Sequence, residues 1–227
     1  MMVDRAFQQA GAVLLRHPCF ATRLSCDVLL SRRRLAAVAV AGAALCGCAS
    51  TQFRSAGQMP EEPLCQGSNE NVSALVLWGA QWRPDQKEPA LREAAAKRGI
   101  EKFFADSRCF MNTRVLESVN DRPALDAAPE DLRGLAARER PVASRALFIT
   151  VRELGPVLKV FNSLALLEGG TELVFDVRSL DIATGRSSSD FQVSWQRGGP
   201  WFIKGTSSLD ADMRAALAAT LRPRAAP

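Results

Sequence analysis

Apolar and polar positions after residue 70 follow two periods, one typical of strands and one typical of helices. The continuous apolar half of Val72–Trp78 indicates a strand that is buried on both faces. Residues 90–105 follow the helical period instead. Their inward face carries Ala96, Ile100, Phe103 and Phe104, and their outward face carries Arg92, Glu93, Lys97 and Glu101. We therefore expect a central strand followed by an amphipathic helix.

The next segments repeat this alternation of strand and helix. Thr113–Val119 alternates as a short strand, and a proline beside acids begins a helix expected over residues 129–138. Arg145–Leu154 reads as a strong strand, which the dipeptide Gly155-Pro156 is expected to close. For residues 157–170 the sequence leaves two interpretations open: a paired strand, or a bent connection or helical turn.

Two later strands predict a hairpin. Glu172–Leu180 and Ser188–Gln196 alternate on either side of the turn Thr184-Gly185-Arg186. A three-residue turn pairs Phe175 with Trp195, Val177 with Val193 and Ser179 with Phe191. Trp78 and Trp195 then belong to the core, while the other hairpin face is expected to be solvated; it carries Asp176, Arg178, Gln192 and Ser194.

The chain closes with a glycine-bounded loop and a helix. Gly198–Gly205 holds Trp201, Phe202 and Ile203 between glycines that permit unusual backbone angles. Ser207 and Asp210 have capping-box spacing, and the helix that they open ends before Pro223. Its inward positions are Met213, Ala216, Leu217 and Leu221. The expected fold class is α/β (α+β), a single mixed sheet in the order β-α-β-α-β-hairpin-α with helices packed on the sheet.

A lipidation signal precedes this domain. Ser31 and the arginines at 32–34 lead into the apolar run Leu35–Leu45, which is shorter than the roughly 20 residues needed to span a bilayer. Leu45-Cys46-Gly47-Cys48 resembles the lipobox of bacterial lipoproteins, which implies removal of residues 1–47 and lipid attachment to Cys48. Cys46 is a weaker candidate because no leucine stands three residues before it.

The localisation that this leader implies is the outer membrane. Ala49 follows the lipidated cysteine, and the aspartate that retains enterobacterial lipoproteins at the inner membrane is missing there. We expect the protein to be lipid-anchored on the periplasmic side. Residues 1–30 are long for a leader and suggest an overextended start. The arginines at 32–34 also resemble a twin-arginine signal, so the export route stays open.

Removal of the expected leader changes the net charge of the chain. The chain has 29 Lys and Arg against 24 Asp and Glu, and residues 1–47 hold six of the former and two of the latter. The remaining 23 and 22 charges nearly cancel, which removes the argument for a nucleic-acid partner. Residues 48–64 are polar and read as a tether of at most about 55 Å, followed by one domain at 65–222 and a tail at 223–227.

The cysteines and the missing residue types narrow the chemistry. Cys65 and Cys109 remain in an oxidising compartment and are expected to form a disulfide. The chain's single histidine, His17, lies in the leader and tyrosine is absent, so the usual groups for acid-base work and zinc binding are missing. Asp210 and Asp212 read as helix-terminal acids. No catalytic residue, metal or cofactor is expected.

The strand order, the turn Leu180-Asp181-Ile182-Ala183-Thr184-Gly185-Arg186 and the closing helix resemble a small α/β domain of envelope proteins. Its families are the amino-terminal domain of the Tol-system periplasmic protein, the curli-secretion lipoprotein and the lipoprotein activators of penicillin-binding proteins. The resemblance covers residues 70–222 and implies a non-catalytic domain that docks on other envelope proteins. The short tether departs from the activators, whose long one crosses to the cell wall.

We therefore expect a docking or accessory module that binds the membrane through Cys48 and binds another envelope protein. The candidate anchors for that partner are loop aromatics and their neighbour: Trp82, Trp201, Phe202 and Ile203. One alternative is a cell-wall or glycan hydrolase that uses carboxylates. A second alternative is an accessory lipoprotein of a lipid or small-molecule transport system.

Overall fold

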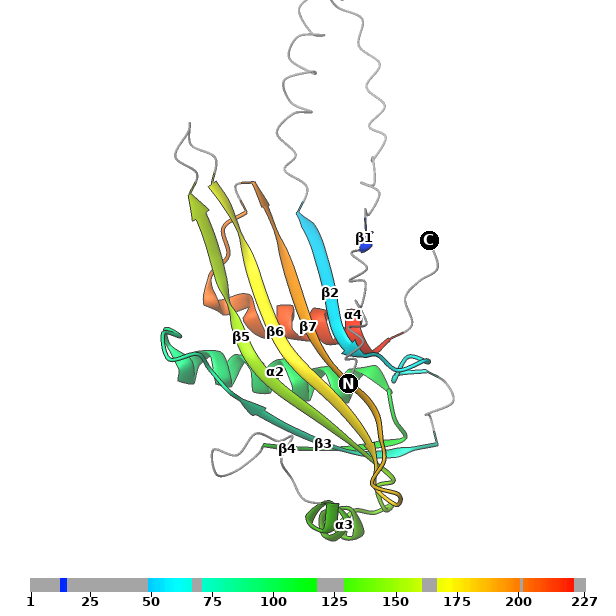
Figure 1. Ribbon diagram of the computed structural model, residues 1–227. Coiled ribbons are helices and arrows are strands. Elements are labelled where there is room, and N and C mark those ends of the chain that lie inside the picture. Colours follow the sequence, from blue (N-terminus) through cyan, green and yellow to red (C-terminus); the bar gives the residue numbers. More distant parts are fainter. Residues whose placement is uncertain are drawn as a thin grey trace, which may run out of the picture.

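The computed structural model describes residues 13–15, 49–66, 71–117, 129–160, 167–200 and 202–222 (Figure 1). The strands are β1 (Val13–Leu15), β2 (Ser50–Gln58), β3 (Ser73–Ala80), β4 (Asn112–Glu117), β5 (Arg145–Val160), β6 (Leu167–Asp181) and β7 (Ser187–Pro200). The helices are α2 (Pro89–Ser107), α3 (Pro129–Arg138), the 3-10 turn η3 (Thr206–Ser208) and α4 (Leu209–Leu221).

The described strands form one mixed seven-stranded sheet in the order β1-β2-β7-β6-β5-β3-β4. β3 runs parallel to both β4 and β5, because α2 and α3 provide the crossovers that parallel neighbours need. All other neighbours are antiparallel. The expected fold class, a single mixed sheet with helices packed on it, is confirmed.

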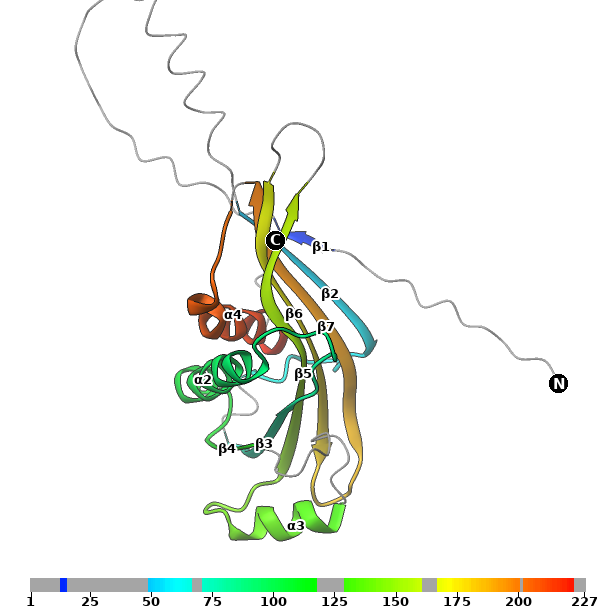
Figure 2. The ribbon, with the colours of Figure 1, turned by 90° about the vertical axis from the view of Figure 1, so that its left-hand side faces the viewer.

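Each face of the sheet has its own core. α2 and α4 pack side by side on one face, against a cluster that includes Trp78, Phe175 and Trp195 (Figure 2). α3 lies at one end of the other face, where Leu132 packs with Phe148 and their neighbours. The predicted inward positions of α2 and α4 are all buried, and so are both core tryptophans.

The expectation that residues 49–64 form a structureless tether is wrong. Ser50–Gln58 is β2, which pairs along its whole length with β7, and Leu64 is buried. Phe53 is the one buried side chain of β2, so no apolar period marks this strand in the sequence. Its place is set by backbone hydrogen bonds to β7, which a hydrophobic pattern does not report.

Gly155-Pro156 does not close the fifth strand. β5 continues to Val160 and pairs with β6 throughout, apart from a bulge between Val151 and Glu153. β3 covers the other edge of β5 only as far as Val151, so Pro156 lies where that edge is open. A proline is tolerated at an open edge because its missing N–H has no partner to lose. Of the two interpretations left open for this stretch, residues 157–160 adopt the paired strand.

The predicted hairpin exists, but its register is shifted by two residues. Phe175 pairs with Val193 and Val177 with Phe191, whereas Trp195 pairs with Leu173. The turn begins at Asp181, earlier than expected, and the Asp181 carboxylate accepts hydrogen bonds from the Thr184 backbone N–H at 2.8 Å and hydroxyl at 2.7 Å. A bulge between Ser179 and Leu180 also changes the register. A shift of two preserves the face of every side chain, so the apolar row still faces the helices.

Three charged side chains that were expected on an outward face or at a helix end are buried. Arg92 donates from Nε to the Lys87 carbonyl at 2.5 Å and from Nη1 to the Leu154 carbonyl. Gly155 leaves the room for this guanidinium, because a Cβ there would stand 1.7 Å from Arg92 Nη1. Asp176 and Asp212 are the other two, with 7% and 1% of their surface exposed.

The disulfide between Cys65 and Cys109 is present, with Cα atoms 4.4 Å apart. The Cys65 backbone N–H also donates to the Leu221 carbonyl at 2.7 Å. The bridge therefore joins the segment after β2, the end of α2 and the end of α4. It closes the helix layer at its carboxyl ends.

Candidate functional site

Four glycines gather at the end of the sheet opposite α3, which we call the glycine end. Gly169 pairs with Gly199 and Gly170 with Gly198 across β6 and β7. A Cβ on Gly169 would stand 2.4 Å from the Phe202 carbonyl oxygen, and one on Gly198 2.2 Å from the Gly169 carbonyl oxygen. Side chains are excluded here because backbone packs on backbone. Positive φ is not the reason, since among the described glycines only Gly57 and Gly185 adopt it.

β2 begins at this same end. Ser50 pairs with Gly198, and the Ser50 hydroxyl donates to the Gly198 carbonyl at 3.3 Å. Cys48, the expected lipid attachment residue, lies outside the described residues. It precedes Ser50 by two residues, so covalent geometry keeps the two Cα atoms within about 7 Å. Any anchor on Cys48 would hold the glycine end against the membrane.

The glycine-bounded loop Gly198–Gly205, which holds three of the predicted partner anchors, lies at the glycine end before α4 begins. Ile203 is 73% exposed, the largest exposure among the large apolar side chains that the structure describes as exposed. Phe202 is half-buried, and the Lys204 ammonium lies 5.4 Å from its ring centroid. Trp201 lies outside the described residues. Leu158 of β5, which pairs with Gly169, adds a second exposed apolar side chain at this end.

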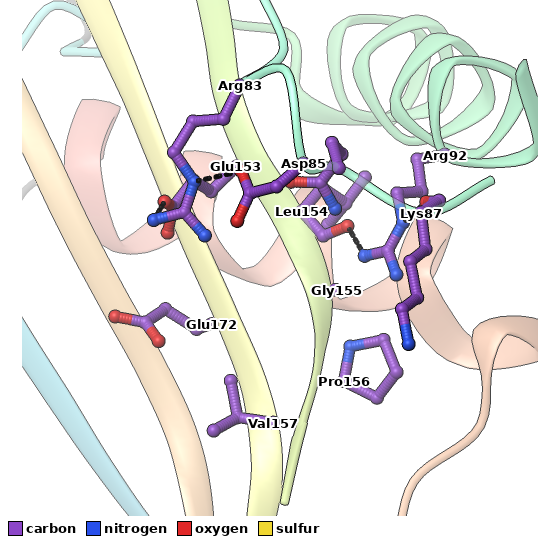
Figure 3. A pocket seen from close by; sticks show the side chains of 11 residues that line it. Arg83, Asp85, Lys87, Arg92, Glu153, Leu154, Gly155, Pro156, Val157 and Glu172 are labelled. Atoms are coloured by element: carbon purple, nitrogen blue, oxygen red, sulfur yellow. Dashed lines mark hydrogen bonds and ion pairs between the residues drawn. The ribbon is translucent and has the colours of Figure 1, made fainter. Parts of the chain in front are cut away.

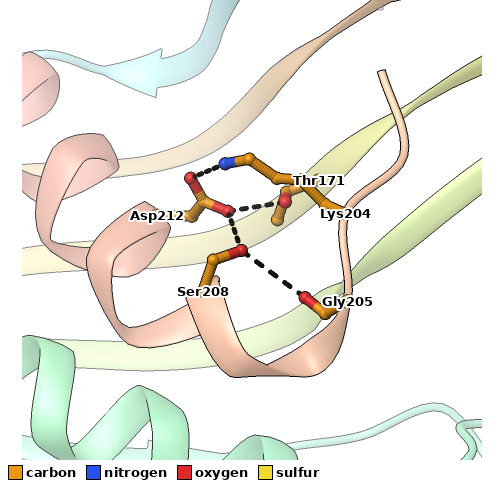
Figure 4. Close-up of polar contacts among 5 residues, drawn as sticks. All are labelled: Thr171, Lys204, Gly205, Ser208 and Asp212. Carbon is orange, nitrogen blue, oxygen red and sulfur yellow. Dashed lines mark hydrogen bonds and ion pairs between the residues drawn. The ribbon is translucent and has the colours of Figure 1, made fainter. Parts of the chain in front are cut away.

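A buried polar network braces the loop (Figure 4). Lys204 Nζ donates to one Asp212 carboxylate oxygen at 2.5 Å, and the Thr171 hydroxyl donates to the other at 2.6 Å. The Ser208 hydroxyl lies 3.5 Å from the same carboxylate and from the Gly205 carbonyl. The loop is thereby tied to both α4 and β6, so Ile203 stands on a fixed backbone.

Sequence reasoning missed this network because it assigned Asp212 to a helix cap. Ser208, not Ser207, precedes α4, and its side chain makes no capping bond to a helix N–H. The 3-10 turn η3 precedes α4, which begins at Leu209, one residue later than expected. The available signal was spacing, since Asp212 lies four residues before Ala216, a predicted inward position, and residues four apart share one face of a helix.

Trp82 does not stand in solvent. Its ring is half-buried and packs against the core under α2 and α4. Its indole N–H is buried without a hydrogen-bond partner among the described residues. This position favours a core role over the role of partner anchor.

The sheet face away from α2 and α4 carries a second polar cluster. Asp176 accepts from Arg152 Nε at 2.5 Å and from Gln192 Nε2 at 2.9 Å, and Arg152 Nη1 donates to Gln81 at 3.0 Å. Each charge is paired or hydrogen-bonded, which explains how Asp176 is tolerated at 7% exposure. The cluster joins β5, β6 and β7 and offers no unpaired carboxylate for catalysis.

A charged hollow of about 240 Å³ lies where α2 begins (Figure 3). Arg83 and Glu153 form an ion pair across it at 2.7 Å, and Glu172 and Lys87 also line it. Acidic and basic side chains are mixed, so the hollow has no single sign of charge. The carboxylates of Asp85, Glu153 and Glu172 all line this hollow.

The described residues contain no group of three or more His, Cys, Asp or Glu side chains placed to hold a metal ion. None of the helices described here has both the length and the apolar character needed to cross a bilayer.

No protein-family model and no curated protein matches this chain. Among solved structures it is similar to a PelC dodecamer from Paraburkholderia phytofirmans, with 12% identity, a TM-score of 0.38 and coverage of 77% of this chain and 99% of that one. It is also similar to lipoprotein GNA1162 from Neisseria meningitidis, with 15% identity, a TM-score of 0.40 and coverage of 65% and 96%. Scores this low establish neither a family nor a function.

Proposed function

We propose that this chain is a lipid-anchored envelope lipoprotein that docks on another envelope protein without catalysing a reaction. The observation that carries the proposal is Ile203, which is 73% exposed on a braced loop at the end of the sheet where β2 begins. An exposed apolar side chain on a fixed backbone loses little conformational entropy when a partner covers it. The lipobox at Cys48 supplies the anchor, and the absence of Asp at position 49 supports the outer membrane.

The start of β2 makes the reach of this module short. Only Ala49 separates the expected lipidated cysteine from the first strand residue, Ser50. The spacer is therefore about 7 Å in place of the roughly 55 Å expected for a 16-residue tether. A partner of the glycine end must lie at the membrane surface or be embedded in the membrane. This reach argues against an activator that crosses to the cell wall.

The resemblance to the Tol-system, curli-secretion and activator domains stays a prediction. It agrees with the proposal in one respect, since those domains work by docking. The rigidity of the loop adds a physical argument, because the Lys204–Asp212 ion pair is almost fully removed from solvent, with side-chain exposures of 15% and 2%. A buried pair of this kind holds one conformation better than a surface pair does.

Site-specific photocrosslinking in the lipid-anchored chain tests the proposal. A photoreactive amino acid at position 203 should form a crosslink to one protein, and the same group at Leu91, which is 42% exposed on α2, should not. Ile203→Ser should reduce capture of that protein at least about tenfold, as loss of an interface anchor does. Leu91→Ser is the matched control.

Equal crosslinking from positions 203 and 91, or no protein crosslink from 203, would refute docking at this end. Trp201→Ala is an independent test of the same loop. If the ring contacts the partner, binding should weaken by about 2 kcal/mol or more while stability changes little. A stability loss of about 3 to 5 kcal/mol would instead assign Trp201 to the core.

The hydrolase alternative is favoured by one observation, the convergence of Glu153 and Glu172 on the charged hollow. The Arg83 guanidinium pairs with Glu153 at 2.7 Å, so this carboxylate already has a partner. Release of soluble fragments from purified cell wall tests this reading. Under our proposal Glu172→Gln leaves that release at background, whereas activity that disappears with this substitution would establish the hydrolase.

A further inference from the structure

A second hollow lies on the helix side of the sheet and is strongly basic. Its volume is about 410 Å³, and three arginines line it: Arg197 of β7, Arg214 of α4 and Arg222, which follows the last residue of α4. Phe103 of α2 and three alanines of α4 supply an apolar floor. Asp106 is the one acidic residue in the lining. We call this feature the arginine hollow.

Asp106 does not neutralise the three guanidinium groups. Its carboxylate lies 3.7 Å from Arg214 Nη1 and is shared with Lys102 at 3.3 Å. Both Arg214 and Asp106 are about half exposed, so this ion pair is weak and a ligand can displace it. Arg222 stacks over the Phe103 ring at 5.7 Å, which leaves the edge of its guanidinium available to an anion. Arg197 is exposed.

The position of Arg197 relates the arginine hollow to the expected anchor. Arg197 pairs with Thr51, the second residue of β2. Thr51 follows Cys48 by three residues, so their Cα atoms lie within about 11 Å of each other. Lipid attached to Cys48 would bring the lipid head groups of the membrane to this edge of the molecule.

We propose that the arginine hollow binds the phosphate-bearing head group of an anionic phospholipid. Guanidinium groups donate two parallel hydrogen bonds to phosphate oxygens, which suits three arginines around one space. Phe103 and the alanines offer apolar contact to the glycerol backbone and the first acyl carbons, which a free phosphate ion would leave unused. The inference depends on the proposed function in one respect, namely that the membrane is the source of this ligand.

A head group held here would give the protein a second membrane contact besides its lipid. Contact at the arginine hollow would also fix the rotation of the domain about its anchor. The glycine end and Ile203 would then always present the same side to a membrane partner.

Native mass spectrometry of the full, lipid-carrying protein in a neutral detergent tests the proposal. Titration with phosphatidylglycerol should produce a saturable one-lipid adduct, and phosphatidylcholine should bind at least about tenfold more weakly. Arg197→Gln combined with Arg214→Gln should weaken the phosphatidylglycerol adduct at least about tenfold, because each cation near an anionic lipid contributes independently. Arg98→Gln is the matched control, since Arg98 is an exposed arginine of α2 that does not line the hollow.

Unchanged melting temperatures show that the variants are folded, and Arg222→Gln serves as a second variant if the double substitution is not. Equal binding of both lipids, or an adduct that survives the arginine substitutions, would overturn the proposal. Binding of inorganic phosphate as tight as that of phosphatidylglycerol would refute the lipid as ligand. Tight binding of a poly-glutamate peptide in place of lipid would assign the hollow to an acidic protein segment. The crosslink from position 203 does not depend on any of these results.

Discussion

Replacing Asp212 with Asn gives the sharpest test of how the loop that carries Ile203 is held. The substitution keeps the shape of the side chain and an acceptor for the Thr171 hydroxyl, which lies 2.6 Å away. It removes the negative charge that faces the Lys204 ammonium at 2.5 Å. The Lys204 side chain is 15% exposed, and its ammonium would be left without its counter-charge.

The structure sets the size of the effect. Removing one partner of a buried ion pair costs about 3 to 5 kcal/mol. Lys204 is long and retains some exposure, so it can turn its ammonium toward water, which places the cost near the lower end. We expect Asp212→Asn to lose about 3 kcal/mol of unfolding free energy. For a domain of this size that loss lowers the melting temperature by roughly 6 to 12 °C.

A double-mutant cycle separates the ion pair from general packing. Lys204→Met leaves the carboxylate with the Thr171 and Ser208 hydroxyls and should cost about 1.5 to 3 kcal/mol. The double variant removes both charges together and should be more stable than the sum of the two losses by about 1 to 3 kcal/mol. Urea unfolding of the full chain, followed by circular dichroism with the disulfide intact, measures all three values.

The same variants connect stability to function. If Asp212 braces the loop, Asp212→Asn should also reduce crosslinking from position 203, while Ile203→Ser should leave the melting temperature unchanged. A loss of less than about 1 kcal/mol in Asp212→Asn would show that the carboxylate is solvated and would refute the brace. Additive losses in the cycle would refute the ion pair itself.

Three further outcomes are expected. The intact mass of the membrane form should match a chain that begins at Cys48 with lipid, and the Cys48→Ser variant should remain unprocessed or soluble. A mass equal to that of the uncleaved chain would remove the basis for the proposed outer-membrane localisation. Neither Cys65 nor Cys109 should react with an alkylating agent in unreduced, unfolded protein, and replacing both with Ser should cost about 3 to 4 kcal/mol. Hydrogen bonds from Thr184 lower the pKa of Asp181 below its usual 3.8, so they stabilise the fold above that pH and this contribution is lost as pH falls through the lowered pKa. The difference in melting temperature between the native chain and Thr184→Val should therefore shrink from about pH 6 to about pH 3, and a constant difference would contradict the assignment.

The sequence by itself determined the elements whose side chains are apolar and periodic. Val72–Trp78, the inward faces of α2 and α4 and the face assignment of the hairpin were all predicted correctly, because burying apolar surface is the dominant favourable term in folding. The start of α3 at Pro129 followed from a local rule about helix ends. The disulfide followed from counting the cysteines that remain after the expected leader.

Only the tertiary structure decided the positions of the polar residues that matter most for the site. β2 has a single buried side chain and is a strand because β7 offers it a row of backbone partners far along the chain. Asp212 lies in a first helical turn and could have been a capping acid. It is buried because Thr171, 41 residues away in sequence, and Lys204 converge on it. A polar side chain is buried only where such partners meet it, and the fold alone brings them together.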